Sequence, residues 1–240
     1  MSGPAVRAVV CDIEGTTGSA AHVREVLFPY ARERLTGWLA AHRDTTEGQR
    51  VLHQVRAHAG DPELDERGAA AALAAWSDAD VKAPPLKDVQ GLIWAEGYAR
   101  GELRGHVYDD VPPALARWRR AGLVTAIYSS GSVAAQRHWF AHSDHGDLSP
   151  LLCDYFDLVS AGGKRAADSY GAITTRLGVP AHATLFLSDV REELDAARAA
   201  GWQVLGVRRA GDPRGDRVPG HPTVADLRHV PPDPLPAAAP

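Results

Sequence analysis

Apolar residues follow two different patterns along the chain. Val6–Cys11 is a short, almost continuous apolar run with β-branched residues, which is typical of a strand buried on both faces. From about residue 113 onward, similar runs alternate with helical stretches. Strands are expected at 124–128, 156–159, 184–187 and 203–207, and helices at 113–121, 133–141, 166–177 and 192–200. This alternation predicts an α/β fold in which helices flank a parallel sheet.

The stretch between the first strand and residue 105 has a helical pattern throughout. Helices are expected at 25–41, 49–59, 66–76 and 86–99, with breaks at Gly60-Asp61-Pro62 and Ala83-Pro84-Pro85. We therefore divide the chain into an α/β core (1–18 and 106–211), an inserted all-helical domain (19–105) and a Pro-rich C-terminal tail (212–240). The tail is expected to be loop.

Composition and charge narrow the class of protein. The 240 residues include 30 acidic and 26 basic side chains, and the net charge of −4 disfavours binding to nucleic acid or to an anionic membrane. No apolar run approaches the roughly 18 residues that cross a bilayer, and the N-terminus lacks a signal-peptide pattern, so a cytoplasmic protein is expected. Cys11 and Cys153 lie in apolar surroundings without CxxC spacing, and both are expected to be buried and unbonded.

Polar residues that could carry chemistry follow four of the expected strands. Ligands of open parallel sheets bind at the carboxyl ends of the strands, so these positions are candidates for a site. Asp12 and Glu14 follow the first strand. Beside a divalent cation, one carboxylate could attack phosphorus and the other could protonate the leaving alcohol. Taken alone, such an acidic pair is more often a surface turn.

The other three strand ends offer partners for a phosphate and a cation. Ser129 and Ser130 lie in a turn before a helix, where hydroxyls and N–H groups can cradle phosphate, although most such serines are ordinary helix caps. Lys164 follows two glycines and could neutralise phosphate, or be a solvated surface lysine. Asp189 could bind Mg²⁺ or cap a helix. Their common position at the ends of one sheet favours a shared site.

In this order, Asp12, Ser129, Lys164 and Asp189 resemble the four motifs of the haloacid dehalogenase-like phosphatases. That superfamily usually has Asp at the second acidic position, where this chain has Glu14. The run Asp12-Ile13-Glu14-Gly15-Thr16-Thr17 is similar to the enolase-phosphatases, or acireductone synthases, of methionine salvage. Further stretches agree with that subfamily at 27–30, 90–94, 105–108, 128–132 and 186–189.

The resemblance implies a Rossmann-like core with an inserted helical cap. It implies Mg²⁺ bound by the carboxylates of Asp12 and Asp189 and by the main-chain oxygen of Glu14. Asp12 would be the nucleophile and Glu14 the acid and then the base, while Ser129, Ser130 and Lys164 would hold the phosphoryl oxygens. Lys164 is therefore counted as catalytic as well as substrate-binding. The substrate would be 2,3-diketo-5-methylthiopentyl 1-phosphate, which is enolised and then dephosphorylated to the acireductone 1,2-dihydroxy-3-keto-5-methylthiopentene.

Two other classes of function stay open at this point. One is a generic phosphomonoesterase or phosphomutase on the same scaffold, and the other is a catalytically inactive binding domain. An inactive domain is expected to lose Asp12, Lys164 or Asp189, and this chain has all three. The base that removes the carbon-bound proton in the enolisation is left unassigned, and a monomer is expected.

Overall fold

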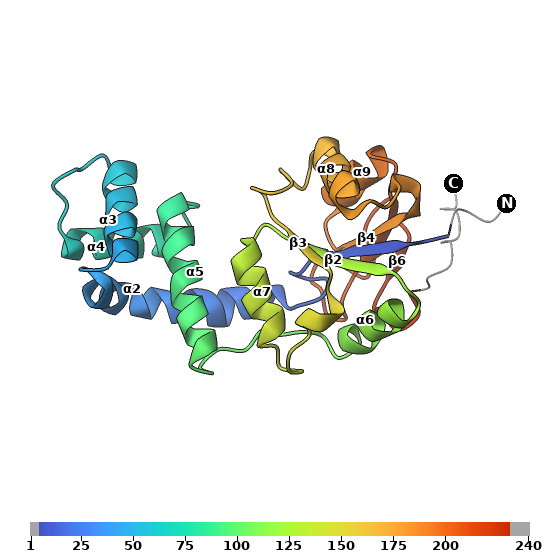
Figure 1. Cartoon of the computed structure of the whole chain (residues 1–240), viewed down its shortest axis with the longest axis horizontal. Coiled ribbons are helices and arrows are strands. Elements are labelled where there is room, and N and C mark those ends of the chain that lie inside the picture. Colours follow the sequence, from blue (N-terminus) through green and yellow to red (C-terminus); the bar gives the residue numbers. More distant parts are fainter. Residues whose placement is uncertain (1–4, 231–240) are drawn as a thin grey trace. The chain divides into compact units, whose positions relative to one another are not determined.

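The computed structural model describes residues 5–230 and divides the chain into two compact units. One unit contains the residues up to Ala20 and from Arg104 onward, and we call it the α/β unit. The other contains Ala21–Leu103 and is called the helical unit (Figure 1).

A six-stranded sheet forms the centre of the α/β unit. Its strands are β1 (Ala8–Cys11), β2 (Val124–Tyr128), β3 (Asp154–Phe156), β4 (Thr184–Ser188), β5 (Gln203–Val207) and β6 (Thr223–Val224). The strand order is β3-β2-β1-β4-β5-β6, and every neighbouring pair is parallel. The chain runs outward from β1 in one direction through β2 and β3, and in the other through β4 and β5. The carboxyl end of β1 is therefore the switch point at which such sheets bind ligands.

Helices cover both faces of this sheet. They are α6 (Val111–Arg120), α7 (Val133–Ala141), α8 (Ala167–Leu177) and α9 (Arg191–Ala199), with short 3₁₀ turns at Ser149–Leu151 and Ala181–Ala183. Figure 1 shows α8 and α9 on one face and α6 and α7 on the other. Val10, Ala126 and Phe186 are register partners on one face, and they form a buried cluster with residues of α8 and α9. The predicted α/β fold with a parallel sheet is confirmed.

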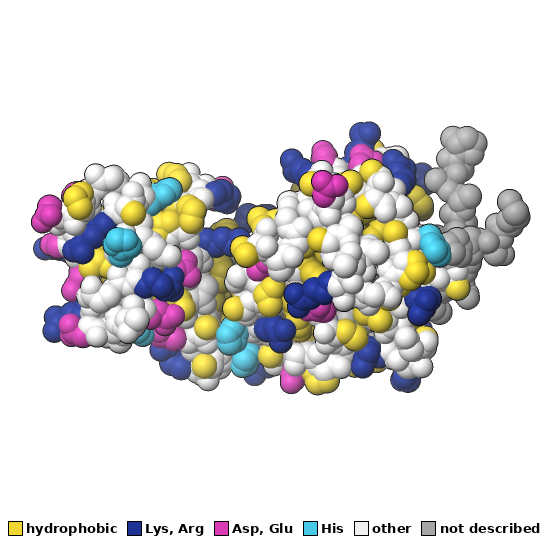
Figure 2. Space-filling model, turned by 45° about the horizontal axis from the view of Figure 1, so that its top comes forward, with side chains coloured by type: hydrophobic (Ala, Val, Ile, Leu, Met, Phe, Trp, Pro, Cys, Tyr) yellow, Lys and Arg dark blue, Asp and Glu magenta, His cyan; other side chains and the backbone are white. Residues whose placement is uncertain are grey.

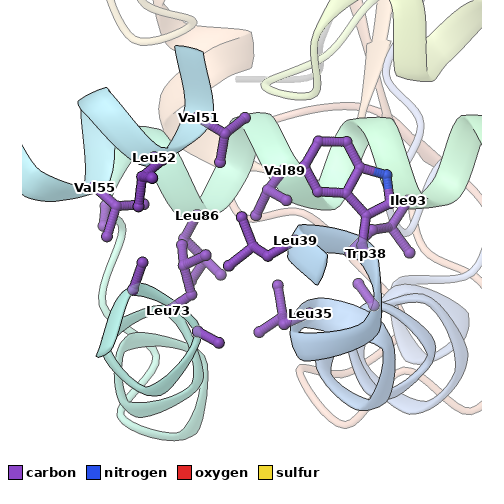
Figure 3. Close-up of a cluster of buried hydrophobic side chains, with 14 residues drawn as sticks. Leu35, Trp38, Leu39, Val51, Leu52, Val55, Leu73, Leu86, Val89 and Ile93 are labelled. Atoms are coloured by element: carbon purple, nitrogen blue, oxygen red, sulfur yellow. The ribbon is translucent and has the colours of Figure 1, made fainter. Parts of the chain in front are cut away.

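The helical unit is built from four main helices. They are α2 (Phe28–His42), α3 (Thr46–Ala59), α4 (Glu66–Asp78) and α5 (Pro84–Ala99), and α2 continues from the short α1 (Ala20–His22) and a π-helical turn at Val23–Leu27. Thr45 and Asp65 accept hydrogen bonds from the third residue beyond them and so begin α3 and α4. Leu35, Leu73 and Val89 are fully buried where the four helices meet (Figure 3). The insert is all-helical, as predicted.

The third strand lies earlier in the chain than expected. β3 ends at Phe156, whereas the apolar pattern predicts a strand at 156–159. The Asp157 carboxylate accepts hydrogen bonds from the main-chain N–H groups of Val159 (3.1 Å) and Ser160 (2.8 Å), which turns the chain. Val159 is consequently 95% exposed. The expected strand is wrong at this end because an aspartate-centred turn outcompetes the apolar run.

The C-terminal segment contains a strand that its Pro-rich composition does not indicate. Thr223–Val224 forms β6 and pairs with Gly206 and Val207 of β5. The expectation of loop alone is therefore wrong at β6, where the edge of the sheet supplies hydrogen-bond partners that composition cannot reveal. The last part of the predicted tail, 231–240, lies outside the described residues.

Cys11 is buried, as expected, but Cys153 is exposed. Cys153 immediately precedes the edge strand β3, and its Sγ lies 3.1 Å from Nη1 of Arg119. The expectation of a buried Cys153 is wrong because no further strand covers this edge of the described sheet. Among residues 5–230, no helix is both long and apolar enough to cross a membrane.

Candidate active site

The carboxyl ends of β1, β2 and β4 bring three predicted site residues to one end of the sheet. Asp12, Ser129 and Asp189 each follow the last residue of their strand. Cys11 is the register partner of both Ile127 and Leu187, and the Asp12 N–H continues the ladder to the Leu187 carbonyl at 2.9 Å. Strand pairing thus places these positions at the sheet's switch point, as the sequence analysis predicts.

Lys164 contacts Asp12 directly, although 152 positions separate them in the sequence. Its Nζ lies 2.6 Å from Oδ1 of Asp12 and 2.7 Å from Oε2 of Glu193. The Glu193 carboxylate also accepts a hydrogen bond from the Ser188 hydroxyl at 2.9 Å. All three charged side chains are buried, so Lys164 is not the solvated surface lysine of the alternative interpretation.

Glu193 is a site residue that sequence reasoning did not assign. It lies in the first turn of α9, directly after the strand end that carries Asp189. An acidic residue in the first helical turn after a polar strand end is the signal that could have found it. Because Glu193 and Asp12 both contact the Lys164 ammonium group, Glu193 is positioned to fix its orientation.

Burial and charge shift the proton equilibria of this cluster. Burial raises the pKa of Asp12 to about 8, while the positive charge of Lys164 opposes the shift and the negative charges of Glu193 and Asp189 add to it. Burial alone would lower the pKa of Lys164, but the carboxylates of Asp12 and Glu193 outweigh it and raise the pKa. Lys164 therefore keeps its positive charge at neutral pH.

The loop after β1 is folded tightly against Asp189. Thr17 donates a hydrogen bond from Oγ1 to the Asp12 carbonyl at 2.8 Å, and the Gly15 N–H donates to the Gly18 carbonyl. Gly15 has φ +75°, and a Cβ at this position would lie 2.3 Å from Oδ2 of Asp189. Only glycine allows the backbone to come this close to the Asp189 carboxylate. Because Gly15 follows Glu14 directly, the Glu14 end of the loop is held near Asp189. The Glu14 residue itself is exposed.

Asp189 has the properties of a cation ligand. It is 4% exposed, and its Oδ1 has no hydrogen-bond partner among residues 5–230. Its Oδ2 forms an ion pair with Nη2 of Arg214. An orphaned buried carboxylate oxygen is unfavourable unless a cation or water satisfies it, so the structure fits a cation at this point.

The described residues contain no cluster of three or more His, Cys, Asp and Glu side chains that could hold a metal ion. The ligand set implied by the resemblance has only two carboxylates and one main-chain oxygen. Such a set suits Mg²⁺, which retains several water ligands.

The serine-containing turn after β2 is held by its neighbours. Ser129 is buried, and its N–H donates to the Phe156 carbonyl at 3.1 Å while its Oγ accepts from the Gly131 N–H at 3.3 Å. Gln136 donates from Nε2 to the carbonyls of Gly131 and Phe156, each at 2.8 Å. Ser130 is exposed. The turn is thus fixed at the start of α7, where N–H groups suit an anion.

Comparison with known proteins agrees with this arrangement. The family model of the haloacid dehalogenase-like hydrolases matches residues 6–201, a range that contains every element from β1 to α9, including the helical unit. The chain therefore belongs to the haloacid dehalogenase-like hydrolase family and, more narrowly, to the enolase-phosphatases within it, as its sequence relatives show.

An enolase-phosphatase E1 of Streptomyces avermitilis is 50% identical over 87% of each chain. An enolase-phosphatase E1 of Thioalkalivibrio sulfidiphilus is 49% identical over 92% of this chain and 97% of its own. The crystal structure of the UTR4 protein of Saccharomyces cerevisiae superposes with a TM-score of 0.78 at 29% identity and covers 92% of this chain and 98% of its own. The resemblance stated from the motifs is confirmed at the level of the family and its subgroup.

Proposed function

We propose that this enzyme enolises 2,3-diketo-5-methylthiopentyl 1-phosphate and then removes its phosphate to give the acireductone. The observation that carries the proposal is the buried contact between Asp12 and Lys164 at the switch point of the sheet. This contact supports the roles proposed for Asp12 as the nucleophile and for Lys164 as the cation that neutralises phosphate. The enolase-phosphatase relatives supply the choice of substrate.

In the phosphatase half-reaction, a carboxylate oxygen of Asp12 forms a bond to phosphorus as the bond from phosphorus to the substrate's C1 oxygen breaks. Lys164 holds Oδ1 of Asp12, which leaves Oδ2 to attack. The departing alcohol oxygen takes a proton from Glu14. Glu14 then accepts a proton from the water that attacks phosphorus, and phosphate leaves as the Asp12 carboxylate is restored.

Mg²⁺ is the proposed cofactor, held by the Asp12 and Asp189 carboxylates and the Glu14 main-chain oxygen. The orphaned Oδ1 of Asp189 and the close approach of Gly15 support this ligand set. Bound there, Mg²⁺ would offset the negative charge of the cluster, favour the ionised form of Asp12 and neutralise the phosphoryl group. Ser129, Ser130 and Lys164 are proposed to bind the phosphoryl oxygens.

We infer that the helical domain, residues 19–105, acts as a cap that excludes water and selects the substrate. A cytoplasmic monomer without a nucleic-acid or membrane partner stays a prediction. On the face in Figure 2, basic and acidic side chains are interspersed on each unit, which supports the prediction that the protein does not bind a polyanion.

The test is a time course with the diketo phosphate ester in which ultraviolet enol absorbance and released phosphate are followed together. Enol that precedes phosphate supports both half-reactions. Phosphate without enol, at a rate no better than for simple sugar phosphates, would leave a generic phosphatase, and isomerisation of glucose 1-phosphate would indicate a mutase. Enol formation by Glu14→Gln and Ser129→Ala variants tests each as the base. Asp168→Asn, an exposed acid on α8, is the control.

A further inference from the structure

An arginine of the C-terminal segment is paired with a carboxylate that the proposed site needs for its cation. Nη2 of Arg214 contacts Oδ2 of Asp189 across 25 positions of sequence. The Arg214 side chain is 48% exposed, whereas that of Asp189 is 6% exposed. A buried ligand is thus neutralised by a charge that reaches it from the surface.

The charges around Asp189 balance differently with and without this arginine. The cluster contains three buried carboxylates, those of Asp12, Asp189 and Glu193, and one buried cation, Lys164, so its formal charge is −2 when all four groups are ionised. Arg214 reduces this to −1. A divalent cation in place of Arg214 brings the cluster to neutrality, while both together leave it positive. Coulomb repulsion in a poorly hydrated site therefore opposes simultaneous occupancy.

Arg214 has a second partner that does not depend on Asp189. Its Nε lies 3.0 Å from Oδ1 of Asp212, and its Nη2 lies 2.7 Å from Oδ2 of the same carboxylate. Gly211 (φ +81°) and Gly215 (φ +92°) adjoin this pair in the left-handed backbone region that glycine adopts without strain. The guanidinium can therefore leave Asp189 for solvent while Asp212 retains it.

We propose that Arg214 competes with Mg²⁺ for Asp189 and so sets the cation affinity of the site. The inference rests on the proposed function, because it takes Asp189 as a ligand of the cation. In the cation-free protein Arg214 neutralises Asp189, and binding of the cation displaces Arg214 from Asp189 while Asp212 retains it. Arg214 is therefore a positioning residue that acts through Asp189.

The experiment is a calorimetric titration of Mg²⁺ into the full-length protein without substrate. Arg214→Gln is expected to bind Mg²⁺ about fivefold more tightly than wild type, because a half-exposed ion pair contributes on this modest scale. Arg217→Gln is the matched control, since Arg217 is an exposed arginine of the same segment and its loss changes the net charge equally. It is expected to leave the affinity near that of wild type.

Thermal unfolding provides a second measurement. Addition of Mg²⁺ after EDTA treatment should raise the unfolding midpoint more for Arg214→Gln than for wild type, since tighter binding to the folded state stabilises it more. Equal or weaker Mg²⁺ binding by Arg214→Gln overturns the inference. If wild type binds Mg²⁺ and Asp189→Asn abolishes that binding, the proposed cation site survives this failure. Wild-type protein that binds no Mg²⁺ overturns both.

Discussion

The two units of the chain bury different kinds of side chain. Within residues 21–103, all of which the structure describes, Gln90 is the one buried residue outside the apolar, aromatic and small types. The α/β unit instead buries Asp12, Lys164, Asp189 and Glu193 at one end of its sheet. Removing charges from water is unfavourable even when they are paired. The helical interior therefore serves stability, while part of the α/β interior serves chemistry at the expense of stability.

Replacement of the Asp12 carboxylate is expected to have the largest effect on activity while leaving stability intact. We expect Asp12→Asn to lower phosphate release by about 10⁴-fold or more, because the nucleophile is lost. Stability without Mg²⁺ should not fall, since Lys164 retains Glu193 and one buried charge is removed. Phosphate assays and urea unfolding measure the two effects. A folded Asp12→Asn variant with substantial turnover would exclude Asp12 as the nucleophile.

A second buried ion pair in the α/β unit involves none of the proposed catalytic residues. It therefore tests how buried charges affect the stability of this unit. Arg209 contacts both oxygens of Asp110 at 2.7 and 2.8 Å and donates from Nε to the Thr16 carbonyl at 2.9 Å. Arg209→Met should lower the free energy of unfolding by about 3–5 kcal/mol, because it leaves Asp110 buried without its partner.

The double variant Arg209→Met/Asp110→Leu provides the control for this pair. It should recover much of the loss, since neither buried charge is then left alone. Urea denaturation of the three proteins measures the coupling. If Arg209→Met has no effect on unfolding, the pair does not support the loop after β1.

Structural features that depend on local sequence signals could be predicted from the sequence. The helices of the helical unit follow from apolar periodicity, although the cap at Thr45 begins α3 earlier than the expected position 49. The strand ends follow from apolar runs that stop at polar residues. The contacts of Lys164 with Glu193, of Arg214 with Asp189 and of Arg209 with Asp110 join elements that only the fold brings together. Composition around each residue contains no signal for these long-range pairs. Positions of candidate site residues were therefore predictable, while most of their partners were not.

The helical unit should respond to loss of apolar volume rather than loss of charge. Leu73 is fully buried between its helices (Figure 3), and Leu73→Ala should lower the free energy of unfolding by about 2–5 kcal/mol. Val81→Ala, at a position that is 42% exposed, should change it by less than about 0.5 kcal/mol. The Mg²⁺ affinity should be unchanged in Leu73→Ala, since all the proposed ligands lie in the α/β unit. A large change in that affinity would contradict the view that the interior of the helical unit affects stability and not the cation site.

The smallest expected effect concerns the turn that ends β3. Oδ2 of Asp157 accepts a hydrogen bond from the Val133 N–H at 2.9 Å, at the start of α7. Burial would raise the pKa of Asp157, but the N–H donors of Val133, Val159 and Ser160 outweigh it and hold the pKa below its ordinary value. Asp157→Asn should lower the free energy of unfolding by about 1 kcal/mol at neutral pH.

The pH dependence of the stability loss in Asp157→Asn shows whether Asp157 stabilises the turn as a charged hydrogen-bond acceptor or only by packing. Because the pKa of Asp157 is lowered by folding, its stabilisation is present above the pKa of the unfolded chain, near 3.8. It is lost as the pH falls through the lower pKa of the folded state. Unfolding of wild type and Asp157→Asn at pH 7, 5 and 3 should therefore show a difference that is constant down to about pH 5 and shrinks below pH 4. Asp168→Asn should show no such convergence, and a pH-independent difference for Asp157→Asn would mean that its charge does not hold the turn.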